Sequence, residues 1–412
     1  MSHLFVLEWM TTHIKIRGRN KNFATSPLVL CSVPLFPYIH YKLIERKSGG
    51  QQHFFMILFM PERSERNGKK MNKRNNYIDI CKGIGIISVV VGHAANTDYF
   101  YSAGVNDIRK FVYIYHLVIF FWCSGYLYKQ KDIRAFANKI IKQYYFKNAL
   151  ICLMSLVLLP LWNKLRVYDV IGMKDLLMRI LRIFAFKTGG IYVGAVWFVQ
   201  FLCITYVIFY ITRTFLKQQA WVADVALGIL GIILVLNKKL GIYYVNLALL
   251  MQPVFGFGYY CKNKPKVFLR FKDINFLPIM VLLIVIMNKM TGQEIEFSKS
   301  QIYGGWLFYP MVLIGLLFVF SLASLVEKLN GKIIQIIGKH SLFIMSTHFI
   351  VFKLFDGIVG NYIKETTNSL TLFPIVFPEY RILYALIGIF VPLGVIILWK
   401  WICSKIMLCV KK

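Results

Sequence analysis

Two basic side chains lie inside the first long apolar stretch of the chain. Lys82 and His93 are eleven residues apart in Asp79-Ile-Cys-Lys82-Gly-Ile-Gly-Ile-Ile-Ser-Val-Val-Val-Gly92-His93. An α-helix turns ~100° per residue, so this separation returns to within about 20° of the same face, about 16 Å further along the helix. A charged side chain inside a membrane span costs about 2.5–3.5 kcal/mol on insertion scales, so each one needs an explanation. The pair indicates a cation near one end of a helix and an imidazole deeper in, which suits proton transfer.

A second histidine lies in the next apolar stretch, Tyr113-Ile-Tyr115-His116-Leu-Val-Ile-Phe-Phe-Trp-Cys-Ser124-Gly125-Tyr126. His93 is expected about four residues before the end of its helix and His116 about five residues inside the next, at ~1.5 Å rise per residue. In an antiparallel pair of helices these two depths coincide. We therefore interpret His93 and His116 as a candidate reactive pair.

Each of these side chains also has a purely structural interpretation. A histidine such as His116 often hydrogen-bonds to a neighbouring carbonyl group. Lys82 can extend to the lipid interface, and Asp79 can pair with Lys82 or cap the start of the helix. Their matching depth and shared stripe favour function. Three glycines of the first stretch allow another helix or a ligand to approach closely: Gly83, Gly85 and Gly92.

Transmembrane helices are the elements that must position these residues. The 412-residue chain is 58% hydrophobic, its mean hydropathy is +0.58, and apolar runs of about twenty residues recur along it. We predict an all-α polytopic membrane protein with about ten transmembrane helices. The predicted spans are 78–97, 111–128, 144–162, 192–212, 220–236, 241–260, 275–290, 305–325, 340–357 and 382–402.

The formal net charge of +31 indicates a membrane protein and no nucleic-acid partner, because the basic residues lie in short loops between apolar runs. Basic segments precede the first span, follow the second, occupy 261–274 and end the chain. With about ten spans these segments share one side, so both termini are predicted to be cytoplasmic, in the inner (plasma) membrane. The basic segment 163–191 falls on the opposite side in this topology and does not fit it.

Residues 1–70 differ from the rest, since their two apolar pieces, 27–38 and 53–60, are too short to span a bilayer. We predict that 1–70 is a disordered extension or an over-long start, and that 71–412 forms the transmembrane domain. The eight cysteines are scattered and form no CxxC pair. They predict neither a disulfide framework nor a metal site.

The stretch from Arg74 to His93 resembles the opening of the membrane acyltransferase-3 family, and within it the fucose 4-O-acetylase-like, polysaccharide O-acetyltransferase branch. That family is marked by Arg or Lys, ten residues and His, a pattern that Lys82 and His93 reproduce. Its next marker, Phe-His-x-Pro-x-Phe-Phe-x-x-Ser-Gly-Tyr, is similar to residues 115–126, where Val118 replaces the proline.

Three later motifs resemble the same family in the same order. Lys139-Ile-Ile-Lys142 matches a basic pair in which arginine is more usual, a change that removes bidentate phosphate contacts. Residues 196–199, Val-Trp-Phe-Val, resemble a Leu-Trp-Phe-Leu marker. Residues 337–342, Ile-Gly-Lys-His-Ser-Leu, followed by His348, resemble a Gly-Lys-x-Ser-Leu…His marker. The resemblance covers nearly everything after Met71.

This resemblance implies an integral membrane O-acyltransferase that moves an acetyl group from acetyl-CoA to a hydroxyl of an envelope glycan or a lipid-linked saccharide. Point charges at the cytoplasmic mouth then hold the CoA phosphates, and the residues expected to supply them are Lys82, Lys139 and Lys142. His93 acts as general base or carries the acyl group as an acyl-imidazole.

The remaining candidates have supporting roles in the same chemistry. Asp79 orients Lys82 or the ligand, and His116 moves the proton or stabilises the oxyanion. His348 and Trp197 are weaker candidates for the acceptor side. A packed histidine and a packing or interfacial ring are the structural alternatives for them.

A transporter or flippase for a lipid-linked sugar or small anion is the main alternative, because intramembrane His and Lys also mark proton-coupled paths. The sequence shows no inverted repeat and no paired broken spans in its two halves, which argues against it. A purely structural membrane subunit has no use for buried Lys and His.

Overall fold

The computed structural model describes residues 75–95, 103–168, 171–237, 244–291, 295–300, 302 and 305–410. The predicted extension 1–70 lies outside the described residues. Every regular element among the residues described is helical, so the predicted all-α class is confirmed for them.

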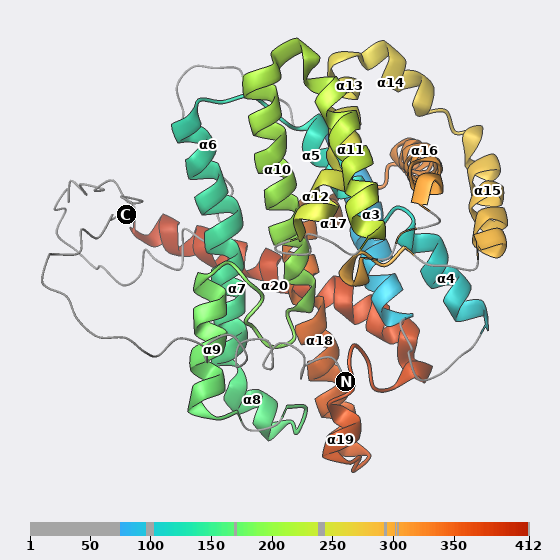
Figure 1. Cartoon of the computed structure of the whole chain (residues 1–412). Helices are drawn as coiled ribbons and strands as arrows, with labels where there is room; N and C mark the ends of the chain where they lie inside the picture. The colour runs from blue at the N-terminus through green and yellow to red at the C-terminus, as the bar shows by residue number, and fades with distance from the viewer. Residues whose placement is uncertain are drawn as a thin grey trace, which may run out of the picture. The chain divides into compact units, whose positions relative to one another are not determined.

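The α-helices of the described chain are drawn in Figure 1. In chain order they are α3 (Asn76–Ala94), α4 (Ala103–Tyr113), α5 (Val118–Tyr126), α6 (Ile133–Lys139), α7 (Phe146–Val157), α8 (Leu159–Lys164), α9 (Met173–Phe184), α10 (Trp197–Leu216), α11 (Ala220–Leu236), α12 (Val245–Leu250), α13 (Gln252–Asn263), α14 (Pro265–Phe271), α15 (Phe276–Thr291), α16 (Phe308–Lys328), α17 (Lys332–Lys339), α18 (Ser341–Tyr362), α19 (Thr367–Leu370) and α20 (Arg381–Val410). A π-helical turn, Ile140–Tyr145, joins α6 to α7, and a 3-10 turn, Gly194–Val196, precedes α10.

Within the described ranges, five helical stretches are long and apolar enough to cross a membrane. They are Asn76–Ala94, Gly194–Leu236, Gly305–Lys328, Ser341–Tyr362 and Pro378–Ile406, and a shorter apolar helix covers Phe276–Met290. Gly194–Leu236 contains most of two predicted spans, 192–212 and 220–236. The chain is therefore a membrane protein, whereas the total of about ten spans and the cytoplasmic termini stay predictions.

Three predicted spans are not the continuous helices that the sequence analysis expected. Span 144–162 divides at Leu158, and span 241–260 divides at Met251. In both, a proline stands in the first turn of the next helix, Pro160 and Pro253, because proline is favoured there and breaks a helix elsewhere.

The third broken span, 111–128, contains one of the candidate histidines. α4 ends at Tyr113, residues 114–117 form a turn, and α5 begins at Val118. His116 therefore lies in the turn and not inside a helix, which corrects its predicted placement. The turn is fully buried in protein, and irregular backbone at membrane depth is tolerated in such a setting.

Among the helices that the structure describes, α3 packs against α4, α5, α16, α17, α18 and α20. Its first turn is capped by Asn75, whose side chain accepts a hydrogen bond from the Ile78 amide at 3.3 Å. The cap is therefore Asn75 and not Asp79, which is buried in the first turn. This contact pattern makes α3 the helix from which the candidate site is built.

The N-terminal half of α3 packs against α17 backbone to backbone. A Cβ atom added to Gly338 would lie 1.7 Å from the Asp79 carbonyl oxygen, and one added to Gly83 would lie 2.2 Å from the Ile334 carbonyl oxygen. Only glycine permits helices to approach this closely. The glycine pair therefore fixes the position of α3 at the Lys82 end.

Candidate active site

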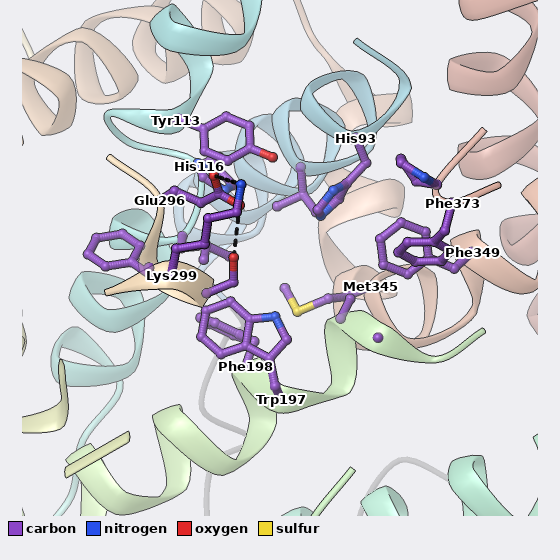
Figure 2. A pocket seen from close by; sticks show the side chains of 17 residues that line it. His93, Tyr113, His116, Trp197, Phe198, Glu296, Lys299, Met345, Phe349 and Phe373 are labelled. Carbon is purple, nitrogen blue, oxygen red and sulfur yellow. Dashed lines mark hydrogen bonds and ion pairs between the residues drawn. The ribbon is translucent and has the colours of Figure 1, made fainter. Parts of the chain in front are cut away.

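A cavity of about 320 Å³ lies at the C-terminal end of α3 (Figure 2). α3, the α4–α5 turn, the start of α10, α18 and two loops contribute to its wall. The lining residues are Val89, His93, Tyr113, His116, Leu117, Gly194, Ala195, Trp197, Phe198, Glu296, Phe297, Ser298, Lys299, Met345, Phe349, Phe373 and Pro374. Segments almost 300 residues apart in the chain thus meet at one place.

His93 projects into this cavity from the last turn of α3. Its ring stacks on the His348 ring at 5.3 Å between centroids with an interplanar angle of 24°, and lies 4.7 Å from the Phe349 ring. In the part of the chain that the structure describes, neither ring nitrogen of His93 is hydrogen-bonded. Aromatic contacts hold the ring in place, and its nitrogen atoms remain available to a substrate.

The other two histidines share a single hydrogen-bonding arrangement. His116 Nδ1 lies 3.1 Å from the Val112 carbonyl oxygen, and His348 Nδ1 lies 3.1 Å from the Ile344 carbonyl oxygen. A carbonyl group only accepts, so each Nδ1 carries the proton and each neutral ring keeps a lone pair at Nε2. Both rings are therefore proton acceptors at Nε2 and not donors. His348 is fully buried behind His93.

An ion-paired edge closes one side of the cavity. Glu296 accepts from Arg109 at 3.2 Å and from Lys299 at 3.1 Å. Ser298 Oγ donates to the same carboxylate at 3.0 Å. Figure 2 shows Glu296 and Lys299 of this group above Trp197. No local sequence pattern predicts this group, because Arg109 and Glu296 are 187 positions apart.

The comparisons with known proteins agree with this geometry. A family model described as an acyltransferase domain matches residues 75–401. The chain belongs to the acyltransferase-3 family. The matched range includes every residue that lines the cavity. Members of the family are acyltransferases, so this protein is a membrane acyltransferase. No curated protein and no solved structure shows a significant match to the chain.

Aromatic rings form much of the remaining wall of the acyltransferase cavity. Trp197 stacks on Phe201 at 6.0 Å, with an angle of 9° between the rings. Phe349 packs against Phe373 at 4.6 Å on the other side. Rings at these separations exclude water and present flat apolar faces.

A fully buried ionic cluster supports the cavity segment that contains Phe373. Lys353 Nζ lies 2.7 Å from Asp356 Oδ2, and both side chains are 0% exposed. Lys353 also donates to the Leu372 carbonyl group, and Asp356 accepts from the Tyr384 hydroxyl and from the Val376 amide. The cluster thus binds the backbone on both sides of Phe373 and Pro374.

The structure brings only some of the sequence-predicted residues to the cavity. His93, His116 and Trp197 line it, and His348 supports His93 from behind. Asp79 is buried and Lys82 is partly buried in the first half of α3, and neither lines the cavity. Their proposed role in binding the acyl donor stays a prediction.

The lysine pair also lies apart from the cavity of this acyltransferase. Lys139 Nζ donates to the Tyr206 hydroxyl at 2.7 Å and lies 4.0 Å from the centre of that ring. Lys142 is exposed in the π-helical turn. Lys142 is therefore accessible and Lys139 contacts α10, and the role of both lysines in binding CoA phosphates stays a prediction.

Proposed function

We propose that this acyltransferase moves an acetyl group from acetyl-CoA to a hydroxyl group of a cell-envelope or exported glycan, in the inner membrane. The observation that carries the proposal is His93, whose unbonded ring nitrogens face a cavity with aromatic walls. An imidazole lone pair is the base best matched to a hydroxyl near neutral pH. Aromatic rings such as those of Trp197 and Phe349 provide flat faces on which a sugar ring stacks.

The proposed donor path runs along α3 from Lys82 to His93. Their spacing corresponds to about 16 Å of helix, which is comparable to an extended pantetheine arm. Lys82 binds the CoA phosphates at the cytoplasmic end, with Lys139 and Lys142 as further cations and Asp79 orienting Lys82. The thioester then lies beside the imidazole.

The tautomer of His116 supports a role in proton transfer. His93 takes the proton of the acceptor hydroxyl as its oxygen attacks the thioester carbon. The Nε2 lone pair of His116 supports a role in accepting a proton, since its only N–H is bound to Val112. A route through an acyl-imidazole uses the same unbonded nitrogen of His93.

Acetyl-CoA turnover by the purified protein in lipid nanodiscs tests this proposal. We expect His93→Ala and His93→Gln to lower turnover by about 10²–10⁴-fold, the usual contribution of a general base. His340→Gln, outside the cavity, is the matched control and keeps wild-type turnover. Normal turnover by folded His93→Ala contradicts the role of His93, and folded wild-type protein that neither binds nor consumes acetyl-CoA contradicts the donor.

A labelled acetyl group separates the two proposed routes. An acyl-imidazole leaves radiolabel on wild-type protein after rapid acid quenching, and His93→Gln removes that label. Turnover without protein-bound label supports direct attack by the hydroxyl.

A further inference from the structure

Acyl transfer needs a hydrogen-bond donor at the carbonyl oxygen, where negative charge develops. Most polar groups of the cavity do not meet this need. The N–H of neutral His116 is bound to the Val112 carbonyl group. Ser298 donates its hydroxyl proton to Glu296. Lys299 is paired with the same carboxylate, and its side chain is 56% exposed, so its remaining N–H groups are open to solvent. Glu296 itself only accepts when it is ionised.

Trp197 provides a donor of the required kind. The indole Nε1–H donates and never accepts, and it has no hydrogen-bond partner within the described ranges. In Figure 2 the indole nitrogen is drawn on the ring edge that faces Met345, and both residues line the cavity. In contrast, the buried Trp162 donates its N–H to the Ser155 carbonyl group at 3.2 Å.

The indole ring is also held in a fixed orientation. It stacks on Phe201 and lies 5.3 Å from the Tyr244 ring. Trp197 is the first residue of the 20-residue helix α10, so the positive end of that helix dipole is at the cavity wall. A rigid donor in a positive potential favours charge on a nearby oxygen.

From this geometry we propose that Trp197 is a catalytic residue, whose Nε1–H donates to the acyl carbonyl oxygen as that oxygen becomes negative. The inference rests on the proposed acyl transfer. The acceptor oxygen bonds to the carbonyl carbon, the carbonyl π pair moves to its oxygen beside Trp197, and His93 takes the acceptor's proton. When the carbonyl re-forms, the carbon–sulfur bond breaks. The CoA sulfur leaves with the electron pair and receives the proton from His93.

Trp197→Phe tests the role, because it keeps an aromatic ring against Phe201 and removes the N–H. The probe is acetyl-CoA with water as acceptor, since hydrolysis passes through the same oxyanion. Loss of one oxyanion donor lowers kcat by about 10²–10³-fold, and we expect the KM for acetyl-CoA to change little. Trp221→Phe, at an exposed tryptophan of α11, is the matched control and retains wild-type kinetics.

The outcomes separate this role from packing and from the proposed function itself. Trp197→His, which keeps a ring N–H, is expected to recover part of the kcat that Trp197→Phe loses. Wild-type kcat in folded Trp197→Phe, or a change confined to KM, overturns the role of Trp197 as hydrogen-bond donor to the oxyanion. The proposed acyl transfer itself then still stands. Wild-type protein that consumes no acetyl-CoA overturns the proposed function and the role of Trp197 with it.

Discussion

The two ends of α3 differ sharply in their surroundings. Around Lys82 the helix packs backbone to backbone on α17, through Gly83 and Gly338. Around His93 it meets aromatic side chains and a cavity. One end is therefore fixed by glycine contacts that tolerate almost no displacement, while the other leaves room for a ligand. A reactive side chain needs this kind of rigid support to keep its geometry.

The fixed end also gives a structural reason for a sequence motif. The Gly-Lys-x-Ser segment resembles a family marker, and the structure places its glycine, Gly338, on the carbonyl group of Asp79. The marker thus holds α17 against the helix that contains Lys82 and His93. This marker is far from α3 in the sequence, but in the structure it packs directly against α3.

Gly338→Ala is expected to have the largest effect on stability, because it disrupts the contact between α17 and the fixed end of α3. The new Cβ would lie 1.7 Å from a backbone oxygen, and overpacking of this severity destabilises by about 3 kcal/mol or more. Thermal unfolding in nanodiscs measures the loss. Gly394→Ala is the control, since a Cβ there meets nothing within 4 Å. Equal melting temperatures for the two variants would contradict the close packing.

His116→Phe tests the open end and is expected to reduce kcat by about 10²-fold, because it removes the Nε2 lone pair that accepts a proton. The variant keeps an aromatic ring against Tyr113, and thermal unfolding shows whether the buried turn accommodates the larger phenyl ring. Steady-state acetyl-CoA turnover at several pH values provides the measurement. An unchanged kcat would assign His116 to packing in the α4–α5 turn.

Lys82→Met tests whether the fixed end also binds the acyl donor. Removing one charge-assisted hydrogen bond to phosphate is expected to raise the KM for acetyl-CoA about 10-fold while kcat is retained. Competition with CoA, compared with dephospho-CoA, reports whether a phosphate group is the partner. Lys289→Met, at an exposed lysine of α15, is the control, and an unchanged KM in Lys82→Met would remove Lys82 from the donor site.

Lys142→Met is expected to have the smallest effect, about a twofold rise in the same KM, because exposed charges in water interact weakly. Raising the salt concentration should remove this difference, since the Debye length falls to about 3 Å at 1 M. A difference that persists in high salt would show that Lys142 binds the donor through a desolvated contact.

The sequence predicted those parts of the molecule that depend on local patterns. α3 and the paired positions of Lys82 and His93 follow from apolar length and helical spacing, and the family resemblance is confirmed over residues 75–401. The divisions near Pro160 and Pro253 follow from proline chemistry, although the predicted spans run through both prolines. The turn at His116 has no such signal, since no proline or glycine stands between α4 and α5.

Contacts between distant segments lay beyond sequence reasoning. Glu296 lines the cavity and is held there by ion pairs with Arg109, from a distant segment, and with Lys299. Lys353 and Asp356 form an i,i+3 pair inside the predicted span 340–357. The free-energy cost of placing two charged side chains in a bilayer indicates that the pair has a function. The Tyr384 hydroxyl reaches Asp356 because α20 packs against α18, and the sequence does not predict that packing.

The Lys353–Asp356 pair has a consequence for biogenesis. A segment with one lone charge enters the bilayer at a cost of about 2.5–3.5 kcal/mol, but these two residues are one turn apart and neutralise each other on the same helix. Each charged side chain of α18 therefore has its counter-ion on the same helix when that helix enters the bilayer. The Leu372 carbonyl group, the Val376 amide and the Tyr384 hydroxyl can then join a site whose charge is already balanced.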